Sequence, residues 1–120
     1  MNIMNMNTRH QTGFTLVEIL IVVAIIALLA AIAIPNFVQA RVSSQRAACI
    51  ANLKQIDGAK STWALEFKKL SSASPDDGQL FGATRYIRRK PGCPANGTYT
   101  IDIVANQPSC TFGVSDGHTL

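Results

Sequence analysis

The hydrophobic pattern of the chain is continuous in one region and periodic in the next. Residues 14–34 contain a single charged side chain, Glu18, and residues 19–40 contain none. A helix of that length measures roughly 30 Å, which is enough to cross the hydrocarbon core of a bilayer. A secretory signal places its small-residue cleavage site after such a run, whereas Gly13 precedes it. We therefore predict a membrane-spanning helix that survives amino-terminal trimming.

Beyond Pro35 the apolar residues recur at helical spacing, so residues 36–70 are predicted to continue the helix in amphipathic form. Spacings of three, four and seven place these residues on one stripe: Val42, Cys49, Leu53, Ile56, Trp63, Phe67 and Leu70. The opposite face is expected to lie in water with four basic residues, Arg41, Lys54, Lys60 and Lys68. A stripe of this kind fits any packed domain or coiled coil, so it carries no function by itself.

The remaining residues, 71–120, are predicted to form a small head. Residues 71–78 are dense in Ser, Asp, Pro and Gly, which end a helix and open a loop. Residues 80–87 are read as a short helical turn or an irregular link, and residues 98–104 alternate as a strand does. A second strand is expected at 109–114, giving a hairpin against the Trp63 stripe. The predicted class is therefore α+β, with a long amino-terminal helix and a β-hairpin head.

Charge adds little to this picture. The 120 residues carry a formal net charge of +4, with 11 Lys and Arg against 7 Asp and Glu. The densest basic cluster is Arg85, Arg88, Arg89 and Lys90. Such a cluster usually keeps a surface solvated, and DNA contact is its alternative function. One competing hypothesis is thus a monomeric single-pass anchor that presents a small binding head.

The segment at residues 13–18, GFTLVE, is followed by the apolar residues 19–34 and then by Pro35. This arrangement closely resembles the processing motif of type IV prepilins and type II secretion pseudopilins. The resemblance implies that prepilin peptidase, a membrane aspartyl peptidase, cleaves between Gly13 and Phe14 and methylates the new amine of Phe14. Residues 1–13 would then be the leader and residues 14–35 the core helix of a homo-oligomeric filament.

Glu18 is a carboxylate inside an apolar run, where an unpaired charge costs about 3 kcal/mol. It complements the positive end of a helix, and snorkelling to the membrane interface is the alternative account of it. The family resemblance implies a sharper role, in which Glu18 pairs with the Phe14 amine of a neighbouring subunit and sets the register of assembly. Pro35 removes an amide that bonds the Ala31 carbonyl, so a bend is expected near it.

The resemblance also implies partners and a location. Before assembly the subunit lies among membrane lipids of the bacterial inner membrane, and an assembly platform there extracts it into a periplasmic or extracellular filament. Arg41, Arg46 and Lys54 favour a cytoplasmic head by the positive-inside rule. The family orientation is the reverse, with the head outside the cytoplasm. A short head favours a secretion pseudopilin, and a pilus is the main alternative.

Three cysteines are present, Cys49, Cys93 and Cys110. A Cys93–Cys110 disulfide would stabilise the folded head by about 3 kcal/mol, and resemblance to short pseudopilin heads supports that pairing. Cys49 is expected to be a buried small hydrophobe on the helical stripe.

Catalytic and metal-binding roles find little support. Ser115, Asp116 and His118 have the residue types of a hydrolase triad, but neighbours on a tail lack its geometry, and His118 is read as a polar residue. Asp102, Asp116 and His118 offer too few metal ligands, and for a pseudopilin-like calcium loop only Asp116 is suitably placed. We expect no enzyme activity, cofactor or metal, with calcium left open.

Overall fold

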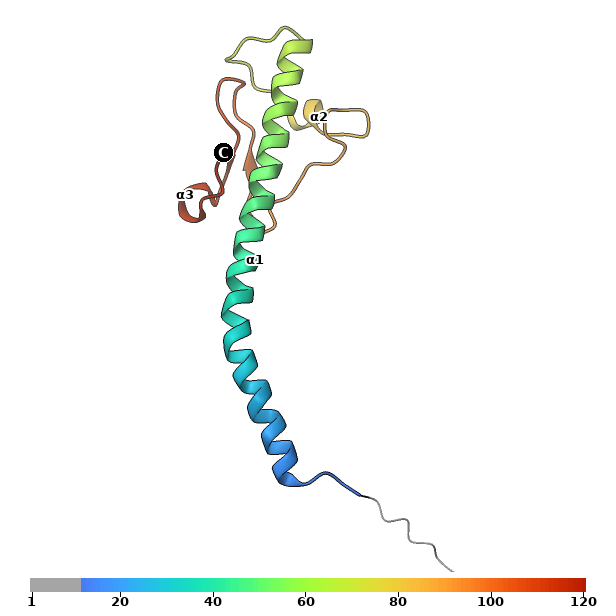
Figure 1. Ribbon diagram of the computed structural model, residues 1–120. Helices are drawn as coiled ribbons and strands as arrows, with labels where there is room; N and C mark the ends of the chain where they lie inside the picture. The colour runs from blue at the N-terminus through green and yellow to red at the C-terminus, as the bar shows by residue number, and fades with distance from the viewer. Residues whose placement is uncertain (1–11) are drawn as a thin grey trace, which may run out of the picture. The chain divides into compact units, whose positions relative to one another are not determined.

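The computed structural model describes residues 12–120 and confirms the predicted α+β class. Its elements, in chain order, are α1 (Leu16–Glu66), α2 (Asp77–Leu80), β1 (Tyr99–Thr100), β2 (Ser109–Cys110) and α3 (Gly113–Asp116) (Figure 1). Two compact units divide the chain, Met1–Phe37 and Val38–Leu120. We refer to the second unit as the head.

Helix α1 has a defined signal at each end. At its start the Thr15 amide donates to Glu18 Oε2 at 2.7 Å, and the Glu18 amide donates to Thr15 Oγ1 at 3.3 Å. This reciprocal pair is a capping box, which satisfies two amides that a helix leaves without partners. At its end the Lys69 amide donates to the Ala64 carbonyl at 2.8 Å, while Lys68 lies in the left-handed region with φ 49°. That geometry is a Schellman motif and ends the helix near the predicted place.

Lys68 is a non-glycine residue at the position where glycine is preferred. A non-glycine residue in the left-handed region costs about 1 kcal/mol of steric strain. This cost is larger than the entropic cost of fixing the more flexible backbone of a glycine on folding. We expect Lys68→Gly to stabilise the head by about 0.5 kcal/mol. A small upward shift of the thermal midpoint of the detergent-solubilised chain checks this. An unchanged or lower midpoint contradicts it.

The amino-terminal part of α1 exposes nearly all of its side chains. Large apolar residues from Leu16 to Ile34 have exposed fractions between 51% and 81%. The helix continues through Pro35, and Asn36 Nδ2 donates to the Ile32 carbonyl at 3.2 Å. The bend expected at Pro35 stays a prediction.

In the head, the strands and both short helices lie along the carboxyl-terminal half of α1 (Figure 1). The antiparallel strands are much shorter than predicted, with Tyr99 opposite Cys110 and Thr100 opposite Ser109. Residues 101–104 leave the ladder, and α3 (Gly113–Asp116) begins within the last two residues of the strand predicted at 109–114. A two-stranded ladder this short depends on packing against the helix, since isolated hairpins are marginal in water.

Two clusters of buried side chains form the core of the head. The first joins the stripe residues Cys49, Leu53 and Ile56 to Tyr99 and Cys110 of the hairpin, as well as Cys93. The second joins Ala59, Trp63 and Ala64 to Leu80 of α2, with Ile101 and Val104 packed against them. The hairpin therefore packs on the predicted stripe, but about two to four turns before Trp63. Val42, Phe67 and Leu70 of that stripe are exposed.

Lys60 is the clearest departure from the sequence pattern. It was predicted on the wet face of the helix, and this is wrong: its exposed fraction is 0%. Its ammonium donates to the carbonyls of Ile101 at 3.0 Å and Ile103 at 2.9 Å, and also to that of Asn106. Burial lowers the pKa of Lys60, while the carboxylates of Asp57 and Asp102 oppose that shift.

The loop that receives Lys60 is shaped by Asp102. This residue lies in the left-handed region with φ 61°, and its carboxylate accepts from the Ile103 amide at 2.7 Å and from Asn106 Nδ2 at 3.0 Å. A short acidic side chain that bonds its own loop suits this conformation. Asp102 thus turns the chain so that three carbonyls converge on one ammonium.

Candidate functional site

The predicted processing site lies just before α1, in a stretch without regular structure. Residues 12–15 are extended or irregular, and the Phe14 side chain is 86% exposed. Among residues 12–120, nothing lies within 4 Å of the Cβ that a side chain at Gly13 would add. Gly13 and Phe14 are therefore exposed on both sides of the predicted cleavage bond. Residues 1–11 of the predicted leader lie outside the described residues.

The carboxylate of Glu18 is held by the capping box at the start of α1. Its Oε2 accepts from the Thr15 amide. Capping uses one of about four acceptor positions on an ionised carboxylate. The group can therefore cap its own helix and accept from a second donor, such as an amine, at the same time. The sequence pattern suggested attraction to the helix end but not the reciprocal bonds with Thr15.

The apolar half of α1 has the surface of a helix made for a non-aqueous environment. Among the described residues, α1 is the one helix long and apolar enough to cross a membrane, with an 18-residue window of mean hydropathy 3.1 whose side chains are unburied. Ala27 and Ala31 lie one turn apart, with the spacing that lets two helices approach closely. Exposed apolar area on this scale marks contact with lipid, with protein or with each in turn.

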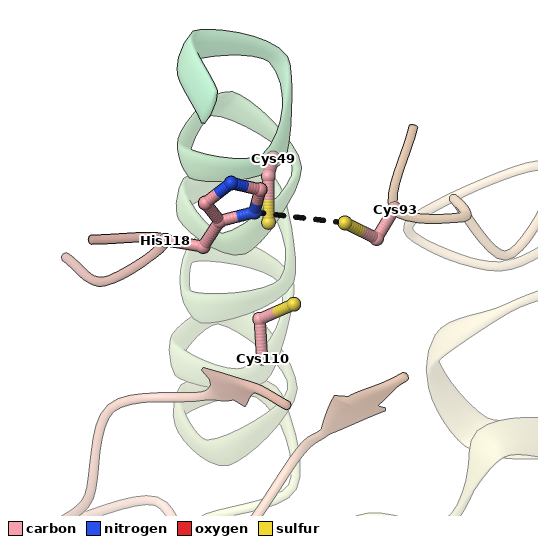
Figure 2. A group of neighbouring side chains, drawn as sticks. All are labelled: Cys49, Cys93, Cys110 and His118. Carbon is pink, nitrogen blue, oxygen red and sulfur yellow. Dashed lines mark hydrogen bonds between the residues drawn. The ribbon is translucent and has the colours of Figure 1, made fainter. Parts of the chain in front are cut away.

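A second candidate site lies inside the head, where four side chains converge from distant parts of the chain. They are Cys49, Cys93, Cys110 and His118, shown in Figure 2. Their sulfur and nitrogen ligand atoms all lie within 4.8 Å of one another, and all four residues are buried. Cys93 Sγ lies 3.7 Å from His118 Nδ1. Among residues 12–120 this is the one group of three or more His, Cys, Asp or Glu side chains close enough to share a metal ion.

Each member of this group is placed by a different structural element. Cys49 comes from α1, Cys110 from β2 and His118 from the segment after α3, while Cys93 begins a tight turn. That turn closes with the Asn96 amide donating to the Cys93 carbonyl at 2.9 Å. Asn96 itself lies at φ 65°, a left-handed conformation that asparagine tolerates.

The surroundings shift the pKa values of the Cys49 and Cys93 thiols in opposite directions. Burial raises the pKa of Cys49 to about 12. Burial also acts to raise that of Cys93, but hydrogen bonds from the Ala95 and Gly97 amides and from the His118 side chain bring it down to about 7. Burial raises the pKa of the Tyr99 hydroxyl, which lies beside Cys49. Cys93 therefore ionises more readily than Cys49.

The structure changes the interpretation of the cysteines and of the histidine. Cys49 is buried, as predicted, but it faces other sulfurs. All three cysteines are free thiols, so the predicted Cys93–Cys110 disulfide is not formed in this structure. The prediction that His118 is a simple polar residue is wrong, since its exposed fraction is 2%. Positions 49, 93, 110 and 118 are too widely and irregularly spaced for a sequence pattern to connect them.

The other candidate residues lie apart from this cluster. Ser115 and Asp116 are exposed on α3, and the Asp102 carboxylate accepts a hydrogen bond within its own loop. In the basic cluster, Arg85, Arg88 and Arg89 are exposed, and Lys90 forms an exposed ion pair with Asp77. That pair partly neutralises the cluster that was considered for DNA.

Comparison with known proteins points to one family. The family described as "Prokaryotic N-terminal methylation motif" matches residues 8–34. The type IV major pilin protein PilA of Myxococcus xanthus is 40% identical over 88 residues, covering 68% of this chain and 40% of that protein. The major component of the type IV wide pilus of Thermus thermophilus is 30% identical over 112 residues, covering 93% of this chain and 79% of that protein.

A secretion-system protein is also similar. Type II secretion system core protein G of Klebsiella michiganensis is 24% identical over 108 residues, covering 80% of this chain and 76% of that protein. The chain spans only 40% to 47% of the length of the first pilins that it matches. Comparison with solved structures found no significant match.

Proposed function

This chain belongs to the family of type IV pilins and type II secretion pseudopilins, and from that membership we propose that it is a filament subunit that polymerises through α1. The observation that carries the proposal is the match over residues 8–34 together with the exposed apolar surface of the helix that follows. A monomer in water could not keep this surface exposed, because apolar area costs roughly 25 cal/mol for each Å². Lipid covers it before assembly and neighbouring subunits cover it afterwards.

Processing precedes assembly in this proposal. Prepilin peptidase cleaves between Gly13 and Phe14 and methylates the amine of Phe14, so that residues 1–13 leave as the leader. The accessibility of Gly13 and Phe14 supports this order. Cleavage also places a positive amine four residues before Glu18, on a helix whose first turn is already capped.

The remaining divisions of the chain follow from this function. Residues 14–35 form the membrane-spanning and later the filament-core helix, residues 36–70 its amphipathic continuation and residues 71–120 the rest of the head. Pro35 bends or loosens the helix during packing. The subunit inserts once into the bacterial inner membrane with its head outside the cytoplasm, and an inner-membrane platform adds it to the filament.

Blocking the cleavage is expected to stop assembly. A bulky side chain at the residue before the cut should exclude the chain from the peptidase, so Gly13→Val should retain residues 1–13 and form few or no filaments. Thr12→Val is the matched control, with the same side chain one residue earlier, and should be processed. Mass spectrometry of the amino terminus decides the result. An N-methyl-phenylalanine at Phe14 is expected in the wild type, and an intact leader on assembled wild-type protein contradicts the proposal.

A pilus and a secretion pseudopilus differ in where the filament ends. Surface fibres seen by electron microscopy that disappear on deletion of the gene indicate a pilus. A loss of protein secretion without such fibres indicates a pseudopilus. A cleaved chain that stays monomeric in cross-linked cells contradicts both and favours a single-pass anchor.

A further inference from the structure

We propose that the head holds a structural zinc ion, bound by the three thiolates of Cys49, Cys93 and Cys110 and by Nδ1 of His118. This inference concerns the stability of the head and does not depend on how the chain assembles. Three sulfurs and one imidazole nitrogen form a common ligand set of structural zinc, which takes four ligands in a tetrahedron.

The distances fit that geometry. With Zn–S bonds of about 2.3 Å and a Zn–N bond of about 2.0 Å, the edges of the tetrahedron are roughly 3.8 Å between sulfurs and roughly 3.5 Å between sulfur and nitrogen. Cys93 Sγ and His118 Nδ1 already lie 3.7 Å apart, and no pair in the group is further apart than 4.8 Å. Contraction by about 1 Å therefore completes the tetrahedron. Figure 2 shows the four side chains directed toward a common centre.

Burial favours a bound ion over an empty cluster. The exposed fractions are 0% for Cys49, 7% for Cys93 and for Cys110, and 2% for His118. A buried imidazole loses its hydrogen bonds to water. The three thiols around it are weak hydrogen-bond partners, so without a metal ion they replace those bonds poorly. A zinc ion uses all four groups at once and closes the site, as structural rather than catalytic sites require.

Groups around the cluster are placed to support thiolates. The amides of Ala95 and Gly97 donate to Cys93, and the Tyr99 hydroxyl bonds with Cys49. Tyr99 is held in turn by Asn52, whose Nδ2 donates to the hydroxyl oxygen at 3.1 Å. Hydrogen bonds of this kind orient ligands and offset the negative charge that three thiolates bring to one Zn²⁺.

Gly97 gives the turn room to approach the site. A Cβ at Gly97 would lie 2.7 Å from Cys110 Sγ and 2.8 Å from Phe112 Cδ2, both too close for any side chain. Because Gly97 has no side chain, the Cys93 turn can lie against β2, and this brings the sulfur of Cys93 close to that of Cys110. The ion would connect α1, this turn, β2 and the segment after α3. Those connections matter in a head with two-residue strands, because small modules commonly need a metal or a disulfide.

A disulfide is the competing state of the same sulfurs. Bonding Cys93 to Cys110 would remove two ligands and leave Cys49 and His118 unable to close a four-coordinate site. Bound zinc, by contrast, keeps all three sulfurs as thiolates, and no cysteine is left over as one is when two of them form a disulfide. The two states therefore differ in metal content, thiol count and mass.

The full chain, purified in detergent without chelator from cells grown with zinc, provides the test. We expect one zinc per chain by elemental mass spectrometry, and three thiols that react only after denaturation with chelator. Replacing the ion with Co(II) should give the intense visible absorption of tetrahedral cobalt thiolates. A metal-free chain with three reactive thiols, or a disulfide between any two cysteines, overturns the proposal.

Variants separate ligation from packing. His118→Gln should lower the zinc content at least tenfold, whereas His118→Cys should keep one zinc per chain because a fourth thiolate completes the tetrahedron. Trp63, the one tryptophan of the chain, reports by its fluorescence whether each variant keeps a folded head. Equal zinc content in the folded Gln variant and the wild type overturns the role of His118. Loss of zinc from a folded Cys variant does so too.

Discussion

Replacing Lys60 with methionine is expected to lower the free energy of unfolding of the head by about 3 kcal/mol. The substitution keeps the length of the apolar stem but removes the ammonium that donates to the carbonyls of Ile101, Ile103 and Asn106. A buried acceptor left without its donor costs about 1 to 3 kcal/mol, and hydrogen bonds from a charged donor are stronger than neutral ones. Removing the buried charge also removes its desolvation cost, which offsets part of the lost stability. The expected decrease is therefore smaller than the sum of three hydrogen bonds.

Urea unfolding of the detergent-solubilised chain, followed by Trp63 fluorescence, measures the change, since Trp63 lies one turn after Lys60 and is 4% exposed. Lys54→Met makes the same replacement at an exposed position of α1 and is expected to change stability by less than about 0.5 kcal/mol. If Lys60→Met is as stable as Lys54→Met, the carbonyls have found other donors and Lys60 does not support the loop.

The misplacement of Lys60 follows from how a helical pattern is interpreted. Position 60 lies four residues after Ile56 and three before Trp63, so geometry puts it on the apolar stripe. Residue type suggested the opposite face, because lysine is rarely buried without partners. Its partners are carbonyls of a loop more than 40 residues later. A local pattern contains no information about where that loop lies.

The long helix and its amino-terminal motif were predictable because each depends on neighbours in sequence. Continuous apolar residues, the GFTLVE segment and the change to a helical stripe are all local signals, and α1 follows them from Leu16 to Glu66. The strands were overestimated for a related reason. Residues 98–104 do alternate, but Asp102 turns the backbone at φ 61°. Beyond it, Val104 packs against the cluster that contains Trp63, and the Ile103 carbonyl accepts from Lys60 instead of pairing in a strand.

The cysteine and histidine cluster could not be derived from the sequence, because its geometry depends on the packing of four segments. Cys93 and Cys110 suggested a pair, and their separation is compatible with one. Cys49 belonged to a helical stripe, and His118 belonged to a polar tail. Only the packed head brings their ligand atoms within 4.8 Å of one another. The signal that was available is composition: an odd number of cysteines in a small module leaves one sulfur that a single disulfide does not explain.

Glu18→Ala is expected to leave membrane insertion and processing intact but to reduce filaments at least tenfold. In the proposed assembly Glu18 bonds with the Phe14 amine of a neighbouring subunit, and the charge pair sets the register of the helices. A misregistered neighbour leaves both charges unpaired in apolar surroundings, at a cost of several kcal/mol. Without the carboxylate every register leaves the amine unpaired. Quantitative immunoblotting of sheared or sedimented filaments, compared with the membrane fraction, measures the loss.

Glu18 also caps α1, so its two roles need separate controls. Glu18→Gln keeps a side-chain oxygen that can accept from the Thr15 amide, since glutamine serves in a capping box as glutamate does, but it removes the charge. Thr15→Val removes the hydroxyl that accepts from the Glu18 amide and keeps the charge. If the charge pair directs assembly, Glu18→Gln fails as Glu18→Ala does, and Thr15→Val still forms filaments. The reverse pattern assigns Glu18 to its own helix alone, because capping then matters to the filament and the negative charge does not.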